Sequence, residues 1–256
     1  MIRRSVCVAF GALLLSLVMV ACSGGESGPA TLPTTGAAVC EGLKEAERFR
    51  YVFSYVIESP KQAEPPDDSA LGDYALPPSF PDFRFETKHA GAFVKPDRLD
   101  IEITSPSAQG QSALRTVRIG ENQWFLVDDN WQVDTNPNPA AFQFSPPVIC
   151  DAMLSPLDLA GATGVPENVG DTAAMRFSIN GATLPVSSQL LGPQSDMGRL
   201  LQSYDVNLWL SEDKARLVKA EAVSKATYPF GRELSIRFTL EAASYDEKGI
   251  EVEPPI

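Results

Sequence analysis

The amino-acid sequence contains a single histidine, His89, among its 256 residues. A structural zinc site takes four Cys or His ligands, and Ser-His or Cys-His catalysis needs a histidine beside its nucleophile. His89 stands in a strand-like segment with Arg, Glu and Lys, where we expect it to be solvated. No glycine-rich phosphate-binding loop joins a strand to a helix. The sequence therefore predicts a protein that is not an enzyme and binds no metal or cofactor.

Two alternatives to this prediction stay open. The acidic pairs Asp67-Asp68 and Asp128-Asp129 are placed in turns, where Asp is favoured for backbone reasons. Either pair is also compatible with a weak calcium site. A glycosidase that works with carboxylates alone is compatible with the sequence as well.

Basic residues are scarce, with 21 Lys and Arg against 33 Asp and Glu, and the formal net charge is -12. Removal of the first 21 residues takes away Arg3 and Arg4 and leaves 19 against 33, or -14. A surface of this sign repels phosphate backbones and anionic lipid headgroups. We therefore expect no nucleic-acid partner, and any contact with a membrane must come from something other than a basic patch.

The apolar run at the N-terminus, from Val6 to Ala21, is short of the about 20 residues that a membrane-spanning helix needs. It follows Arg3-Arg4 and ends in small residues, which is the plan of a secretory signal. The stretch Met19-Val20-Ala21-Cys22 resembles the lipobox of a bacterial lipoprotein signal, with Met19 where the pattern most often has Leu.

The resemblance implies that residues 1–21 are a signal peptide and that Cys22 carries a diacylglycerol anchor and palmitate. The mature protein would then lie in the cell envelope, on the outer face of the cytoplasmic membrane, or on the outer membrane where the envelope has one. An ordinary secretory signal followed by an unrelated cysteine is the alternative.

Residues 22–39 are rich in Gly, Ser, Thr and Pro, so we expect a flexible tether followed by one domain over residues 40–256. Of the four cysteines, Cys7 leaves with the signal and Cys22 is taken by the lipid. Cys40 and Cys150 remain in an oxidising compartment, which predicts a disulfide between them. Two free buried thiols are the alternative.

Alternating apolar residues dominate the rest of the chain. The clearest case is residues 48–58, where Phe49, Tyr51, Phe53, Tyr55 and Ile57 recur with period two. Further alternating segments follow each other over short turns, which forces antiparallel pairing. Only residues 148–160 and 188–203 show helical spacing.

These patterns predict a mainly β (α+β) fold. We expect about nine or ten strands in a single, strongly curved antiparallel sheet that forms a half-open barrel capped by two short helical segments. Such a cap is too small to bury the apolar face of the sheet tightly, which favours a cavity between them. A sheet that curls on itself and packs solidly is the alternative.

In the order of these segments the chain resembles the LolA/LolB/LppX superfamily of lipoprotein and glycolipid carriers. The resemblance lies in the lipobox-like cysteine, the linker, the aromatic strand, the segment Gly120-Glu-Asn-Gln-Trp-Phe-Leu-Val-Asp-Asp-Asn-Trp131 and the later Tyr204-Asp-Val-Asn-Leu-Trp-Leu210. It implies a half-barrel whose apolar interior accepts the acyl chains of a lipid or glycolipid ligand. We expect the protein to be a monomer.

The candidates for the cavity wall are the alternate strand residues that point to one face of the sheet, together with apolar residues of the helical segments. Each of them is also a natural core residue. They are Phe53, Tyr55, Phe85, Ile101, Ile103, Trp124, Leu126, Met153, Leu157, Leu200, Leu208, Leu210, Ile236 and Phe238. The predicted function is lipid binding or transport. The alternative is a non-catalytic sensor or structural lipoprotein that uses the same fold to bind a protein partner.

Overall fold

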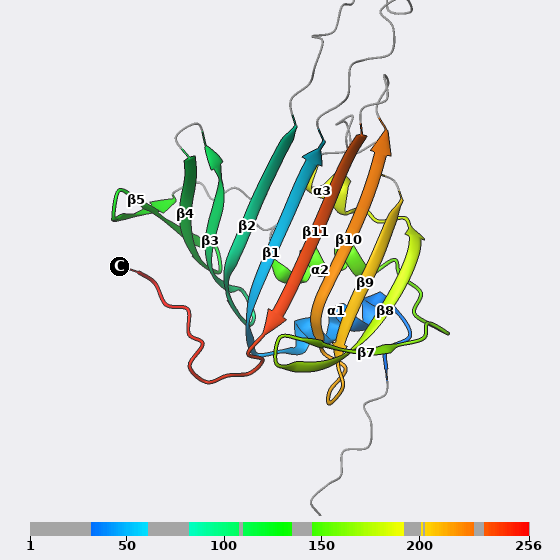
Figure 1. The fold of residues 1–256 in the computed structure, drawn as a ribbon. Coiled ribbons are helices and arrows are strands. Elements are labelled where there is room, and N and C mark those ends of the chain that lie inside the picture. The colour runs from blue at the N-terminus through cyan, green and yellow to red at the C-terminus, as the bar shows by residue number, and fades with distance from the viewer. Residues whose placement is uncertain are drawn as a thin grey trace, which may run out of the picture.

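Figure 1 shows a computed structural model of the chain, coloured from the N-terminus to the C-terminus. The structure describes residues 32–60, 82–107, 110–134, 145–191, 201, 203–227 and 233–255. Within these ranges no helix is both long and apolar enough to cross a membrane.

The strands form one antiparallel sheet of eleven strands in the order β6-β5-β4-β3-β2-β1-β11-β10-β9-β8-β7. The last strand of the chain, β11, pairs with the first, β1, and thereby joins the two halves of the meander. The sheet is curved and does not close, as predicted. The strands are β1 (Arg48–Ser59), β2 (Phe83–Val94), β3 (Arg98–Ser107), β4 (Gly110–Ile119), β5 (Asn122–Val127), β6 (Asn130–Asp134), β7 (Val165–Val169), β8 (Thr172–Ala182), β9 (Tyr204–Ser211), β10 (Leu217–Thr227) and β11 (Glu233–Ala243).

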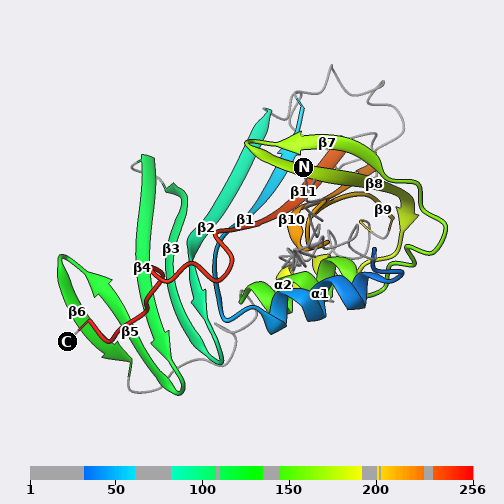
Figure 2. The same cartoon turned by 90° about the horizontal axis from the view of Figure 1, so that it is seen from below.

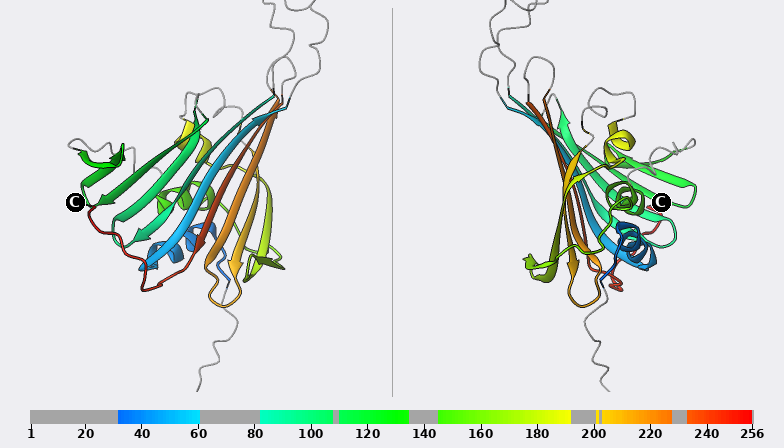
Figure 3. Two further views of the ribbon diagram at one scale, coloured as in Figure 1. Left: turned by 60° about the vertical axis from the view of Figure 1, so that its left-hand side comes forward. Right: turned by 90° about the vertical axis from the view of Figure 1, so that its right-hand side faces the viewer.

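The helices are α1 (Gly36–Glu45), α2 (Pro146–Leu154) and α3 (Val186–Leu191). Figure 2 shows α1 and α2 side by side within the curve formed by β1 and β8–β11. The predicted mainly β fold with a helical cap is therefore confirmed. We call the sheet face toward these helices the inner face and the opposite one the outer face. Figure 3 shows how strongly the strands twist across the sheet.

Helix α1 corrects the expected start of the folded part, because residues 36–39 belong to the helix and not to a tether. The Thr35 side chain caps the helix by accepting a hydrogen bond from the Ala38 amide at 3.2 Å. Val39, Cys40 and Leu43 then fall on one buried face. Composition had hidden this helix, since Gly, Thr and Ala also suit a linker.

Strand β7 is not among the segments predicted from the sequence. Val165–Val169 pairs with β8 as an edge strand. Pro166 is compatible with that place, since an edge strand leaves one row of its amides unpaired in any case.

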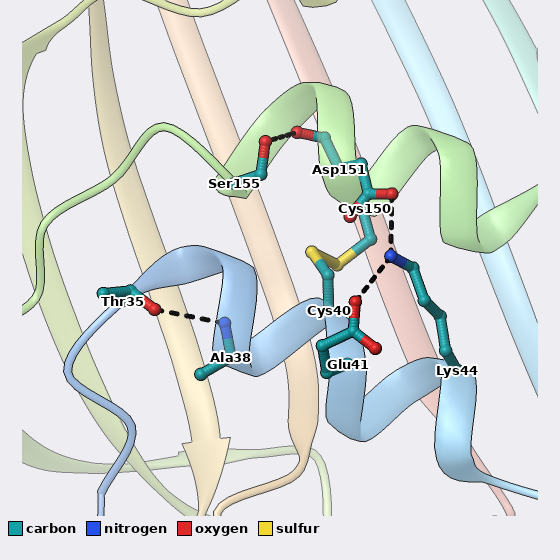
Figure 4. A network of polar contacts seen from close by, with 8 residues as sticks. All are labelled: Thr35, Ala38, Cys40, Glu41, Lys44, Cys150, Asp151 and Ser155. Carbon is teal, nitrogen blue, oxygen red and sulfur yellow. Dashed lines mark hydrogen bonds and ion pairs between the residues drawn. A yellow bond between two sulfur atoms is a disulfide. The ribbon is translucent and has the colours of Figure 1, made fainter.

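The predicted disulfide between Cys40 and Cys150 is confirmed and joins α1 to α2 (Figure 4). The two Cα atoms are 5.6 Å apart, and both residues are buried. Lys44 adds a second link, because its Nζ lies 2.9 Å from Glu41 Oε1 on α1 and 3.0 Å from Asp151 Oδ2 on α2. The hydrogen bonds to Glu41 and Asp151 raise the pKa of Lys44. A disulfide and an ion pair therefore join the two helices.

A smaller apolar cluster lies on the outer face and fixes the C-terminal segment there. Ile250 and Val252 are buried against Ala92, Val117 and neighbours. The carbonyl oxygens of Ile250 and Val252 accept hydrogen bonds from Arg48 and Arg98, at 2.9 and 3.1 Å. The segment containing Ile250 and Val252 thus covers part of the outer face, which the sequence pattern did not predict.

Candidate functional site

The inner face is built by strand alternation in which every second side chain points toward the helices. On β1 these are Phe49, Tyr51, Phe53, Tyr55 and Ile57, the residues whose period marks the segment in the sequence. Phe53 and Leu240 face each other across the β1–β11 ladder. Together with residues of β8–β11 and the helices they form the main hydrophobic core.

Eleven of the fourteen candidate wall residues lie in this core or pack against it. Their side chains occupy the space between the sheet and the helices. They are Phe53, Tyr55, Phe85, Ile101, Ile103, Met153, Leu157, Leu208, Leu210, Ile236 and Phe238.

Trp124 and Leu126 were assigned to the wrong face. Trp124 pairs with Val117 across the β4–β5 ladder and belongs to the outer cluster. Leu126 is two residues further along β5 and therefore shares the outer face. The residues of β5 that point inward are Gln123 and Phe125. Phe125 pairs with Thr116 of β4, and Thr116 pairs with the core residue Ile101 of β3. Leu200 lies outside the described residues.

Among the described residues, most apolar side chains that are only partly buried against the core lie toward one end of the strands, which we call the open end. Helix α3 lies toward this end, and helices α1 and α2 lie nearer the opposite end (Figure 1). Tyr55 and Phe85 stack near each other at this end, with ring centroids 6.0 Å apart. The partly buried residues of the open end are Tyr55, Phe85, Ile103, Ile179, Ala182 and Ala226.

The chain enters the fold at the other end. The Leu159 amide donates to the Thr34 carbonyl oxygen at 2.9 Å, and the Gly36 amide donates to the Leu157 carbonyl oxygen at 2.9 Å. These bonds hold residues 34–36 beside the segment that follows α2. Figure 1 places the start of α1 near the bottom of the sheet and the open end at the top.

His89 is buried on the inner face, at 2% exposure, so the expectation of a solvated residue was wrong. It pairs with Phe53 on one side and Ile103 on the other. Burial lowers the pKa of His89 to about 4 because the charged ring would lose its hydration. The imidazole is therefore neutral near pH 7.

Other buried polar side chains of the inner face were also missed. Thr87, Thr116 and Gln123 are buried on β2, β4 and β5. Their positions could have been found by counting strand phase, since Thr87 and His89 alternate with Phe85 along β2.

A hollow of about 710 Å³ lies elsewhere, at the strand ends beside Val56, Glu58, Arg84 and Arg237. Ion pairs from Arg84 to Glu58 and to Glu86 make its rim polar and charged. Such a surface does not suit acyl chains. Among the described residues, no group of three or more His, Cys, Asp or Glu side chains is placed to hold a metal ion.

Together these features define an open, curved antiparallel sheet that holds helices against an apolar inner face. No protein-family model and no curated protein sequence matches the chain. Among solved structures, LprF from Mycobacterium bovis is similar at 10% identity and a TM-score of 0.43, over 86% of this chain and 94% of that one.

Two further solved structures are similar over much of the chain. A LolA superfamily protein from Nitrosomonas europaea is 12% identical with a TM-score of 0.23, over 82% of this chain and 94% of that one. The ywiB protein from Bacillus subtilis is 7% identical with a TM-score of 0.20, over 80% and 99%.

Proposed function

We propose that this protein is a non-catalytic lipid-binding lipoprotein that takes acyl chains between the sheet and the helices through the open end. The observation that supports it best is the apolar inner face, which runs from fully buried residues such as Phe53 and Phe238 to partly exposed ones such as Tyr55 and Ile103. A bound chain would gain about 0.8 kcal/mol for each methylene group that it buries.

The lipid anchor at Cys22 is part of the proposal and is supported by the lipobox-like sequence. Mass spectrometry of the N-terminal peptide tests the anchor. A diacylglyceryl mass on Cys22 that disappears in Cys22→Ala supports it, and an unmodified cysteine in the cell envelope contradicts it.

Lipid binding itself is tested with the domain that starts at residue 32. The probe is N-phenyl-1-naphthylamine, an uncharged dye that fluoresces in apolar sites, displaced by dioleoylglycerol. Ile103→Trp adds bulk to the inner face at the open end. If it keeps two methylene groups out of the site, binding weakens by about 1.6 kcal/mol, or roughly fifteenfold.

Leu126→Trp is the matched control, because it adds the same side chain to the outer face of the neighbouring part of the sheet. Both residues are half-buried and carry branched apolar side chains. We expect wild type and Leu126→Trp to bind alike and only Ile103→Trp to bind weakly. A wild-type protein that takes up neither probe, or two variants with equal loss, would refute the proposed site.

A further inference from the structure

The inner face is divided into an apolar part and a polar part. Residues of β1 and β8–β11 beneath the helices are almost entirely apolar. By contrast, four of the eight buried polar residues of the described chain lie on the inner face of β2–β5. With Tyr51 of β1, which faces Gly91 of β2, they form what we call the polar strip: Tyr51, Thr87, His89, Thr116 and Gln123.

Register places these residues on one continuous surface. Tyr51 pairs with Gly91, which pairs with Ile101, which pairs with Thr116. A Cβ on Gly91 would lie 1.9 Å from the Asp100 carbonyl oxygen, so β2 and β3 approach each other closely beside Tyr51. From β2 to β5 the strip crosses three strand spacings, about 14 Å. That span accommodates a glyceryl ester group or a sugar ring.

Three of the polar atoms have no hydrogen-bond partner within the described part of the chain. They are the Tyr51 hydroxyl, Thr87 Oγ1 and Gln123 Oε1. All three residues are at least nine-tenths buried. Buried polar atoms are normally paired, because an unpaired one loses its hydration without compensation.

Buried hydroxyls in the other part of the inner face behave differently. Ser59 Oγ donates to the Glu233 carbonyl oxygen at 2.8 Å, and Ser224 Oγ donates to the Ser203 carbonyl oxygen at 2.7 Å. These two serine hydroxyls are satisfied within the chain, whereas the three atoms of the polar strip are not.

The strip is also uncharged near pH 7. Burial lowers the pKa of His89 to about 4 and raises the pKa of Tyr51, so both side chains are neutral. The cation Arg118 shares the inner face of β4 with Thr116 and pairs with Gln123, and its Nε donates to the Gly120 carbonyl oxygen at 3.0 Å. Neutral donors and acceptors favour an uncharged polar group over an ionised one.

We propose that the polar strip binds the uncharged oxygen-bearing head of the ligand, its ester or hydroxyl groups, while the apolar part of the inner face takes the acyl chains. This inference rests on the proposed lipid-binding function and adds the chemical class of the headgroup. It predicts that an ester lipid with a free hydroxyl binds better than a hydrocarbon of similar chain length and better than an anionic phospholipid.

The test compares dioleoylglycerol, octadecane and dioleoylphosphatidylglycerol in the dye-displacement assay. The variants Tyr51→Phe, Thr87→Val and Gln123→Met each remove one of the atoms that lack a partner. We expect each variant to bind dioleoylglycerol about three- to tenfold more weakly, the loss of one hydrogen bond, and to bind octadecane as wild type does. Their melting temperatures should stay equal or rise, because an unpaired buried polar atom has been removed.

Ser224→Ala is the matched control, since its hydroxyl is buried on the same face but is satisfied internally. It should lower the melting temperature and leave the preference for dioleoylglycerol unchanged. Unaltered dioleoylglycerol binding in all three strip variants, while Ile103→Trp blocks both uncharged probes, would overturn the headgroup site and leave lipid binding standing.

Two other results also decide the matter. A wild-type protein that prefers the anionic phospholipid would overturn the uncharged headgroup, with Arg118 the first residue to examine. Wild type that binds no probe at all would overturn both the headgroup site and the proposed function. A clear loss of thermal stability in the strip variants would show that their polar atoms serve the fold and would overturn the site as well.

Discussion

The pH dependence of folding is a direct test of the inner face, because the chain has one histidine and the structure buries it. His89 is enclosed by core residues, and the Phe53 ring meets it edge-on with centroids 5.7 Å apart. Burial lowers the pKa of His89 from 6.5 to about 4. Acid should therefore destabilise the fold as the pH falls below 6.5.

The direction and size of this pH effect on folding stability follow from the number of protons that the folded and unfolded states bind. Between pH 6.5 and 4 the unfolded chain binds a proton at His89 that the folded chain does not, so falling pH favours unfolding. The stability that comes from keeping His89 neutral is fully present above pH 6.5 and is lost as the pH falls toward 4. Lowering the pKa from 6.5 to about 4 corresponds to roughly 3 kcal/mol of stability at most.

Urea unfolding at pH values from 7.5 to 4.5 measures this loss, and His89→Gln is the control. In the variant, the loss of unfolding free energy that protonation of the histidine causes should vanish. The loss that other titrating groups cause should remain. NMR of the single imidazole gives the titration directly, without overlap from another histidine. An imidazole that titrates near 6.5, or parallel stability curves for wild type and variant, would refute the buried placement.

Three further predictions concern the elements that hold the fold together. Cys40→Ala with Cys150→Ala should cost about 4–5 kcal/mol in urea unfolding, because the disulfide closes a loop with a sequence separation of 110 residues; a loss below 1 kcal/mol would contradict this. Ile250→Ala should cost about 2–4 kcal/mol, because the side chain is buried on the outer face, whereas exposed Val165→Ala should stay within about 0.5 kcal/mol. Thr35→Ala should cost about 1 kcal/mol by removing the cap of α1, as thermal unfolding would show.

Much of the architecture could be predicted because its signals are local. The alternation in residues 48–58 becomes β1, and short turns between strands leave antiparallel pairing as the only option. The disulfide followed from elimination among four cysteines. Helix α1 was missed because its cap, Thr35, and its small residues also occur in linkers, so only packing against α2 shows that the segment is helical.

His89 was misplaced for a different reason. Its neighbours Arg84, Glu86 and Lys88 are charged, and composition alone makes the segment look solvated. Those three residues share the outer phase of β2, while His89 shares the inner phase with Phe85. Where a strand has one charged and one apolar face, the alternation of its residues therefore predicts burial better than local composition does.

Strand β5 marks the limit of that rule. Its apolar residues fall in both phases, with Trp124 and Leu126 in one and Phe125 and Val127 in the other. Alternation indicates the buried face only when the opposite face meets water. Here the outer face is covered by Ile250 and Val252, which lie more than a hundred residues further along the chain. No pattern within β5 contains that information, and the buried Gln123 could be assigned to the inner face only once the register with β4 was known.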